Sequence, residues 1–295
     1  MPGLVALALG QADRLPAAEA GERAQLQRHF DLLPRGLPVA ALTRQVDAGD
    51  AASGNWLRAD PAYVRPDING ARLLAIGEGL ALDADDAAAL LPALRPLFGD
   101  TGFPIDAPVP SHWYLRLPLE AKPPRFTDPA EALGADLFEH LPEGAEGRRW
   151  RALLSEAQVV LHNHPHNAAR IAAGKPPVNS LWFWGGGRAP DHVTTVYSVI
   201  STEESLLAAL ANAAVVVPAP LPSTFTDSDG ARLLDLRDHR DAAMLARDWL
   251  APAIESLRSG RLSQLRIDCA DGHGWMLERR QRWRFWRKPL TALDA

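Results

Sequence analysis

Hydrophobic and polar residues alternate with two different periods in the first half of the chain. Apolar residues recur at every second position over 55–76, around a turn signal at Asp67–Gly70, which is typical of a β-hairpin. Over 83–98 and 150–162 they recur every three or four positions instead, which predicts two amphipathic helices. Weaker signals predict further elements, a strand over 112–119 and short helices over 20–33, 39–46 and 130–140.

After Pro190 the hydrophobic residues form short continuous runs. The apolar runs TTVYSVI (194–200) and AAVVV (213–217) predict short buried strands, and the segment 203–212 between them predicts a helix. A strand, a helix and a second strand in this order usually form a unit with parallel strands. Further on, the pattern predicts a long helix and then a closing pair of strands, over 237–258, 264–268 and 275–284.

Together these elements predict an α/β fold with a mixed sheet, in which an α+β front part precedes an α/β rear part. We expect an N-terminal helical segment over 1–52, an α+β part over 53–150, and an α/β part over 151–295. A chain of 295 residues with 47% hydrophobic residues is long enough to bury one large core or two smaller ones.

Charge and cysteine content narrow the classes of function. The formal net charge of -5 argues against a general polyanion-binding surface, so nucleic acid is not an expected partner. The single cysteine, Cys269, excludes an internal disulfide framework and any metal site made of several cysteines. The sequence shows no secretory signal and no run of the roughly 18–20 apolar residues that spans a bilayer, so we expect a cytoplasmic protein.

Many of the side chains that could bind a ligand or a metal lie in one stretch, 161–190, which reads LHNHPHNAARIAAGKPPVNSLWFWGGGRAP. His162, His164 and His166 stand at alternate positions, and on a strand such a set could hold a zinc ion beside an open water site. Pro165 and the preceding helix favour a second interpretation, in which the histidines cap a helix end. No carboxylate stands in this stretch, so no cofactor is expected, and manganese or zinc enters only if the chain is a metal-dependent enzyme.

The same stretch carries four side chains that can donate hydrogen bonds to a phosphate or carboxylate group. Arg170 offers a planar guanidinium, Lys175 an ammonium group, and Asn167 and Asn179 an amide each. The glycines 185–187 could expose backbone amides to an anion or form a tight turn. Trp184, two residues after Trp182, could line a pocket or belong to the core.

The expected hairpin adds charges of both signs. Arg58 and Asp60 stand two positions apart, so their side chains point the same way on a regular strand, and Arg72 stands on the returning strand. These residues are either solvated charges on the sheet surface or a charged fork that lines an anion pocket.

The motif HPHNAARIAAGKPPVNSLWFWGGGRAP (164–190) resembles the His-Pro-x-Asn-x-x-Arg and Gly-Lys-x-Pro-x-Asn-x-x-Trp-x-Trp-Gly-x-Gly segment of archaeal-type cofactor-independent phosphoglycerate mutases. These enzymes belong to the alkaline phosphatase superfamily. Upstream, NWLRADPAYVRPDINGARLL (55–74), WYLRL (113–117) and PAEALGADLFEHLPEG (129–144) are similar to further segments of that family. The resemblance covers about 50–190 and implies a fold that is a degenerate form of that of the mutases.

The resemblance also implies phosphoryl transfer with two metal ions, held by aspartate and histidine clusters, and a serine or threonine nucleophile. This sequence departs from those motifs. The family's Asp-Gly-x-Gly-Asp strand has no counterpart except Asp47–Asp50 in a different setting, and its Pro-His-Asp motif loses the histidine at Asp128–Glu131. Asp268, Asp271 and His273 do not have the spacing of the family's Asp-x-x-x-His pair.

The segment Arg279–Lys288 (RRQRWRFWRK) combines six basic and three aromatic residues. Such a mixture can bind single-stranded nucleic acid through phosphate contacts and base stacking, or an anionic lipid surface. The alternative is a terminal strand in which Trp283 and Phe285 are buried while Arg282 and Arg284 pair with acidic residues.

The whole chain also resembles bacterial regulatory proteins of the pathogenicity-factor E type, through WLRADP, NSLWFWGGG and RFWRKP. The main hypothesis is a non-catalytic, regulatory protein that retains a mutase-like pocket for a small phosphorylated or carboxylated metabolite, with a protein as a possible further partner. Its ligand-binding residues would be Arg58, Asp60, Arg72, His164, Asn167, Arg170, Lys175, Asn179 and Trp184. The alternatives are a metal-dependent phosphomutase or phosphotransferase, and an interaction module that uses the basic-aromatic C-terminal segment.

Overall fold

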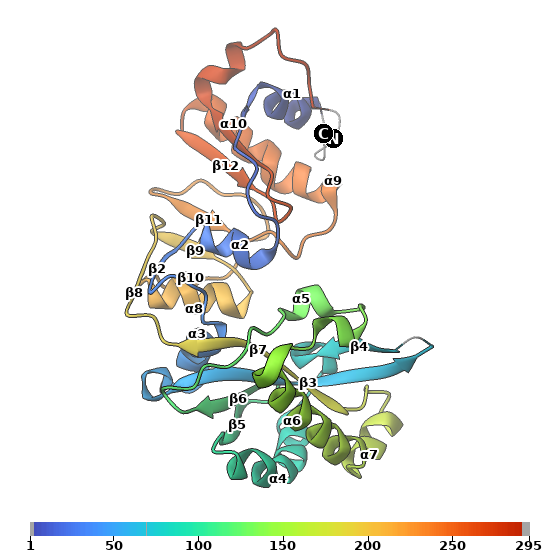
Figure 1. Cartoon of the computed structure of the whole chain (residues 1–295). Coiled ribbons are helices and arrows are strands. Elements are labelled where there is room, and N and C mark those ends of the chain that lie inside the picture. Colours follow the sequence, from blue (N-terminus) through green and yellow to red (C-terminus); the bar gives the residue numbers. More distant parts are fainter. Residues whose placement is uncertain (1–2, 69, 291–295) are drawn as a thin grey trace. The chain divides into compact units, whose positions relative to one another are not determined.

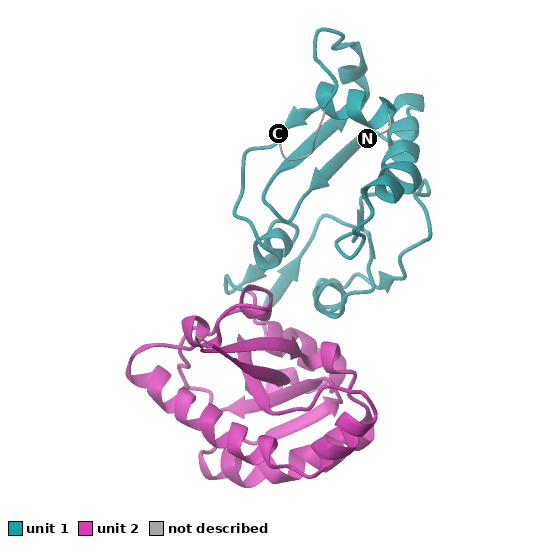
Figure 2. Cartoon of the chain, turned by 90° about the vertical axis from the view of Figure 1, so that its right-hand side faces the viewer, with its two compact units in different colours: residues 1–36, 192–295 teal, residues 37–191 magenta. Residues whose placement is uncertain are grey.

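The chain divides into two compact units (Figure 1 and Figure 2). The computed structural model describes residues 3–68 and 70–290. The central unit is one continuous stretch, Leu37–Asp191, and the flanking unit combines Met1–Gly36 with His192–Ala295. These limits do not coincide with the boundaries expected at 52/53 and 150/151, because strand pairing and helix packing join residues on both sides of each expected boundary.

Strand β3 (Asn55–Asp67) organises the central unit, because three other strands pair with it in antiparallel fashion. The strands around it are β4 (Gly70–Ile76), β5 (Ile105–Val109), β6 (His112–Leu117) and β7 (Ser180–Arg188), and β5 joins the sheet through β6. The predicted hairpin is confirmed, and so are the predicted strand after position 112 and the mixed α/β class of the fold.

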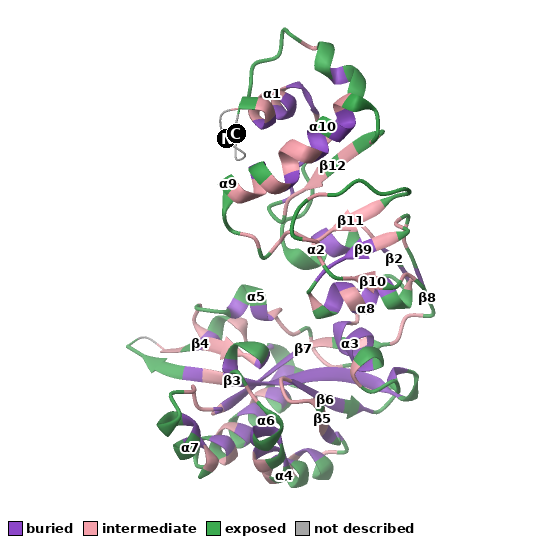
Figure 3. Cartoon of the chain, turned by 180° about the vertical axis from the view of Figure 1, so that it is seen from behind, coloured by how far each residue is buried: buried purple, intermediate pink, exposed green. Residues whose placement is uncertain are grey.

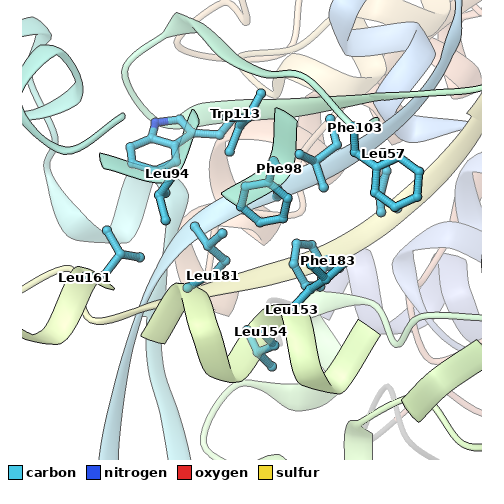
Figure 4. Close-up of a cluster of buried hydrophobic side chains, with 14 of the residues drawn as sticks. Leu57, Leu94, Phe98, Phe103, Trp113, Leu153, Leu154, Leu161, Leu181 and Phe183 are labelled. Carbon is cyan, nitrogen blue, oxygen red and sulfur yellow. The ribbon is translucent and has the colours of Figure 1, made fainter. Parts of the chain in front are cut away.

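One face of this sheet is apolar and packs against two helices, α4 (Ala84–Asp100) and α6 (Gly144–His162). Alternate strand residues supply the sheet side of the core, and Figure 4 shows Leu57, Trp113, Leu181 and Phe183 meeting helix residues such as Leu94, Phe98 and Leu154. Both helices confirm the predicted three-to-four spacing. Asp83 begins α4 with a capping box that it shares with Asp86.

The opposite face of the sheet is covered by short elements. Helix α3 (Val39–Asp47) confirms the helix predicted over 39–46, and it packs Ala40 and Ala41 against Trp56 and Tyr114. Helix α5 (Pro129–Ala132) and the 3-10 turn η3 (Leu137–His140) cover the part of this face that holds Ala62 and Val64. The positions 56, 58, 60 and 62 of β3 are therefore apolar, charged, charged and apolar, so a charged patch lies between two apolar ones. The remaining elements are η1 (Ala51–Ser53), η2 (Gly77–Leu80) and α7 (His166–Ala172).

The three glycines of the central motif lie inside β7, so they neither present amides in an open loop nor form a turn after the strand. Gly185 has a φ of +65°, and a Cβ atom there would meet Val39 Cβ at 2.8 Å. A Cβ atom on Gly187 would meet Pro38 Cβ at 2.7 Å. The glycines allow the start of α3 to approach the strand more closely than any side chain would permit.

The flanking unit is built from small sheets and helices. Its strands are β1 (Asp13–Arg14), β2 (Asp31–Leu33), β8 (His192–Thr194), β9 (Val199–Ser201), β10 (Pro218–Ala219), β11 (Arg232–Leu234), β12 (Gln264–Asp268) and β13 (Gly274–Glu278). Its helices are α1 (Gly3–Gln11), α2 (Glu22–Gln27), α8 (Ser205–Ala213), α9 (Ala242–Met244), η4 (Leu245–Leu250), α10 (Ala251–Ser259) and η5 (Arg279–Trp283). β9, α8 and β10 follow each other as a strand, a helix and a second strand parallel to the first, as predicted, but the second strand lies after the predicted run 213–217.

Several predicted elements of this unit are wrong in position or type. The run 213–217 is no strand, because α8 continues to Ala213 and ends in a left-handed turn at Val215, whose φ is +60°. The run 194–200 divides into β8 and β9. The strand expected over 275–284 stops at Glu278, because Glu278 and Gln281 form a capping box that begins η5.

The boundaries of four predicted helices also differ from those observed, and one of these, α6, begins at Gly144 rather than at 150. The helix expected over 20–33 is limited to α2 and gives way to β2, while the one over 130–140 is split into α5 and η3, with Gly134 at a φ of +80° between them. The long helix expected from 237 starts at Ala242 and contains the π-helical η4. Pro252, in the last part of this helix, has no N–H group to donate to the Asp248 carbonyl four residues earlier. That carbonyl accepts a hydrogen bond from the Phe225 amide instead, at 2.9 Å.

Figure 3 shows burial concentrated along β3, β7 and the inner sides of the helices. Within the described part of the chain, no helix is long and apolar enough to cross a membrane.

The core under the sheet generates a stability prediction. Phe98→Ala removes a fully buried ring that packs on Phe183, so the free energy of unfolding should fall by about 3–5 kcal/mol. Val159→Ala on α6, where the side chain is 64% exposed, should change it by less than about 0.5 kcal/mol. Urea unfolding of the full chain, followed by circular dichroism, measures both, and equal losses would contradict the assignment of this core.

Candidate functional site

Arg58 and Asp60 lie on the same side of β3, as their spacing predicted, and they form a buried ion pair on the charged part of the sheet. Arg58 Nε donates to Asp60 Oδ1 at 2.8 Å, and Nη1 donates to the Thr43 hydroxyl of α3 at 3.2 Å. The side chains of Arg58 and Asp60 are only 5% and 2% exposed. The two residues are therefore neither solvated surface charges nor independent groups.

Aromatic residues enclose this ion pair. The Trp184 indole donates to Asp60 Oδ2 at 2.7 Å, and the Trp113 amide donates to Oδ1 at 3.2 Å. The guanidinium carbon of Arg58 lies 5.2 Å from the centre of the Tyr114 ring and 5.4 Å from that of Trp184. Burial alone would lower the pKa of Arg58, but the charge and hydrogen bond of Asp60, together with Tyr114 and Asp47, outweigh it and raise the pKa above its usual value.

The polar group extends through residues that the sequence did not single out as site residues. Tyr114 donates its hydroxyl to Asp47 Oδ2 at 2.5 Å, and its oxygen lies 2.9 Å from Thr43 Oγ1. His112 Nδ1 lies 2.7 Å from the same carboxylate oxygen of Asp47. Burial would raise the pKa of Asp47, but the bonds from His112 and Tyr114 outweigh it and lower the pKa. The signal was in the sequence: His112 and Tyr114 stand at alternate positions of one predicted strand.

A second charged cluster forms where α7 meets the start of α4. Arg170, whose side chain is 1% exposed, forms an ion pair with Asp86 and donates to the Leu80 and Pro176 carbonyls at 2.6 and 3.0 Å. His166 Nε2 lies 2.7 Å from Asp86 Oδ1. Lys175 Nζ lies 2.9 Å from Asp83 Oδ2. The charges of the motif are thus balanced by two aspartates that lie more than eighty positions earlier in the chain.

The two asparagines of the motif bind backbone. Asn167 donates to the Leu161 and Val178 carbonyls at 2.8 and 2.9 Å and accepts from the Val178 amide at 2.8 Å. Asn179 accepts from the Val64 amide at 2.8 Å and donates to its carbonyl at 2.7 Å. These bonds hold the loop between α7 and β7 and extend the pairing of β3.

The other candidate residues lie apart. Arg72 is 53% exposed on the β4 side of the hairpin, where it pairs with Asp67 and donates to the Gly134 carbonyl at 3.1 Å. His164 accepts the His166 amide at 3.3 Å, and burial together with repulsion by His166 lowers its pKa. The structure therefore gathers Arg58, Asp60 and Trp184 into one group and Arg170 and Lys175 into another.

The residues considered for metal binding do not converge. His166 binds Asp86, while in the flanking unit Asp268 accepts a bidentate pair of bonds from Arg28, at 3.0 and 2.6 Å, and His273 pairs with the exposed Asp271. Among residues 3–68 and 70–290, no group of three or more histidine, cysteine, aspartate or glutamate side chains is placed to hold a metal ion.

Comparison with known proteins shows homology to phosphoglycerate mutases over part of the chain. A probable 2,3-bisphosphoglycerate-independent phosphoglycerate mutase from Geobacter sulfurreducens is 44% identical over 62 residues, which are 21% of this chain and 16% of that protein. The 2,3-bisphosphoglycerate-independent enzyme from Methanosarcina barkeri is 44% identical over 64 residues, 22% of this chain and 16% of the enzyme. The matched stretch is shorter than the span 50–190 that the motifs suggested, and it spans about one-sixth of these relatives.

A solved structure of a cofactor-independent phosphoglycerate mutase from Thermoplasma acidophilum covers 94% of this chain and 81% of its own, at 14% sequence identity and a TM-score of 0.44. A protein from Pyrococcus horikoshii gives a TM-score of 0.42 at 12% identity, and covers 94% of this chain and 80% of its own. No family model matches the chain.

The second charged cluster predicts a large effect of a single substitution. Arg170→Met leaves Asp86 buried without its guanidinium partner, so the free energy of unfolding should fall by about 3–5 kcal/mol. Arg72→Met removes an exposed guanidinium of the same type and should cost less than about 1 kcal/mol. Urea unfolding distinguishes them, and a loss for Arg170→Met as small as that for Arg72→Met would show that the cluster contributes little.

The lowered pKa values of Asp47 and Asp86 predict a pH dependence. A carboxyl group whose pKa is depressed in the folded state stabilises the fold above its unfolded value, near 3.8, and this stabilisation is lost as the pH falls through the folded value. For Asp86, burial would raise the pKa, but bonds from His166 and the Asp83 amide and the charge of Arg170 lower it. Stability should therefore decline below about pH 4. Thermal unfolding across this range should show a shallower decline in Asp86→Asn, and an unchanged slope would contradict the role of Asp86.

Proposed function

We propose that the chain is a binding protein whose central unit holds a small phosphorylated or carboxylated metabolite and acts in regulation rather than in phosphoryl transfer. One observation carries the proposal. Arg58 is buried on the charged part of the sheet, its Nε and Nη1 are engaged, and no acceptor among the described residues binds its Nη2. A buried guanidinium with a remaining donor is suited to an anionic oxygen.

The surroundings of Arg58 support a binding role. Asp60 fixes Nε, Thr43 fixes Nη1, and the rings of Tyr114 and Trp184 lie beside the guanidinium plane, so little side-chain entropy remains to be lost on binding. Trp184 is only half-buried, so part of it remains accessible to a ligand. The homologous mutases act, by their names, on phosphoglycerate, a molecule with one phosphate and one carboxylate.

The engagement of the motif residues supports binding over turnover. Arg170, Asn167 and Asn179 hold the unit together through Asp86 and backbone groups, and the residues considered for metal binding lie in separate places. We therefore assign the motif to shaping the sheet edge, and the ligand contact to Arg58 and Trp184.

Thermal unfolding of the full chain with and without 3-phosphoglycerate tests the proposal, each time with and without Mn²⁺. A ligand that binds only the folded state adds about 2.7 kcal/mol at a hundred times its dissociation constant, and the unfolding temperature should rise without metal. Arg58→Lys retains the charge next to Asp60 but lacks the planar fork, so the ligand shift should disappear relative to that variant's own unliganded value.

Arg72→Lys is the matched control. Arg72 faces Arg65, seven residues further along β3 than Arg58, which is on the order of 23 Å in a strand, so its replacement should leave the ligand shift unchanged. A shift that requires Mn²⁺ would support the metal-dependent phosphotransferase instead. No shift with 3-phosphoglycerate, inorganic phosphate or a dicarboxylate would contradict binding of this class of ligand.

A further inference from the structure

The segment 279–288 exposes its three aromatic residues and buries the polar Gln281, contrary to the interpretation as a closing strand. Trp283, Phe285 and Trp286 are 66%, 86% and 67% exposed. Gln281, by contrast, is 3% exposed and donates to Asp13 Oδ2 at 3.1 Å and to the Met276 carbonyl at 3.2 Å. Polar side chains usually take the outer positions of a folded chain, so this inversion calls for a partner that covers the rings.

The fold holds the segment in this orientation from both ends. η5 starts at the Glu278 capping box, Arg284 pairs with Asp13 and donates to the Gln11 carbonyl, and the Leu290 amide donates to the Ala6 carbonyl at 2.8 Å. Arg287 donates to the Ala12 carbonyl at 2.7 Å. The polar groups of the segment thus bind α1, β1 and the residue between them, and the rings of Trp283, Phe285 and Trp286 remain exposed.

The charge around the rings is strongly positive. The segment has six basic residues and no acidic one, in a chain whose net charge is -5. Asp13 and Glu278 pair with Arg280, Arg284 and Arg287. Arg279, Arg282 and Lys288 have no carboxylate within ion-pair distance among the residues described. The partner that complements this surface is therefore anionic.

We propose that this surface docks onto an anionic phospholipid bilayer. Phe285 and Trp286 meet edge to face, with centroids 5.3 Å apart and planes at 82°, so they form one apolar projection rather than parallel platforms for successive bases. Exposed tryptophan and phenylalanine next to arginine and lysine are the composition of interfacial anchors, in which rings enter the headgroup region and cations bind lipid phosphates.

A neighbouring hollow strengthens the match to lipid phosphates. A cavity of about 670 Å³ adjoins the segment, and it is lined by Arg14, Arg287 and Lys288, by the carboxylate of Asp13 that pairs with Arg287, and by the apolar Leu9 and Leu290. A headgroup phosphate can bind Arg14 and Lys288 while the start of an acyl chain contacts the apolar side.

Co-sedimentation of the full chain with vesicles tests the proposal. The chain should bind vesicles of phosphatidylcholine mixed with phosphatidylglycerol, bind vesicles of phosphatidylcholine alone at least about tenfold more weakly, and dissociate from the former at high salt. Tryptophan fluorescence should shift to shorter wavelength on binding. Phe285→Ser/Trp286→Ser should abolish binding and the shift, and Arg279→Gln/Arg282→Gln/Lys288→Gln should weaken binding by roughly a hundredfold.

The matched control is Val215→Ser/Val217→Ser, which removes two apolar side chains that are 92% and 85% exposed elsewhere in the same unit. It should bind vesicles as the unaltered chain does, and circular dichroism should show all variants folded. Failure of the unaltered chain to bind the mixed vesicles, or full binding by the Phe285/Trp286 variant, would overturn the proposal. Binding to a single-stranded oligothymidylate without binding to vesicles would replace it with a nucleic-acid surface.

Discussion

The ion pair between Arg58 and Asp60 sets the arrangement of the central unit. Two charges in the middle of a sheet lose several kcal/mol of hydration each, and only close partners return that energy. Here the partners come from three other elements, Thr43 of α3, Trp113 of β6 and Trp184 of β7. A shift of β3 by one residue would place both charges in the apolar core on the other face, so the pair also fixes the register of the sheet.

The motif shared with the phosphoglycerate mutases acts, in this chain, largely through backbone and buried charge. Asn179 takes the place of a strand residue beside Val64, Asn167 ties Leu161 to Val178, and Arg170 joins α7 to the first turn of α4. Residues whose types suggest ligand binding can thus serve instead to hold the fold together through hydrogen bonds and ion pairs. Arg58, outside that motif, retains the donor on which the proposed function rests.

The sequence predicted those elements in which one face is clearly more apolar than the other. β3, β4, β6, α4 and α6 follow that rule, and even the shared side of Arg58 and Asp60 came from the two-residue period. The partners of Arg170 and Tyr114 could not be predicted, because Asp86 and Asp47 lie 84 and 67 positions away and no local pattern links them. The strand predicted over 213–217 is wrong for another reason. Val215 and Val217 lie just after the end of α8 and are exposed, and apolar residues in such a turn carry no information on strand pairing.

The central unit interrupts the flanking unit between Gly36 and His192, where β2 and β8 pair and bring the two crossings of the chain together. At a translation rate of about 5–20 residues per second, the 155 residues of Leu37–Asp191 take on the order of 10–30 s to synthesise. During that time α1, β1 and β2 have emerged from the ribosome while β13 and β8, their pairing partners, do not yet exist. The first part of the chain must therefore wait in an unpaired state while the inserted unit, whose strands are all contiguous in sequence, completes its own sheet.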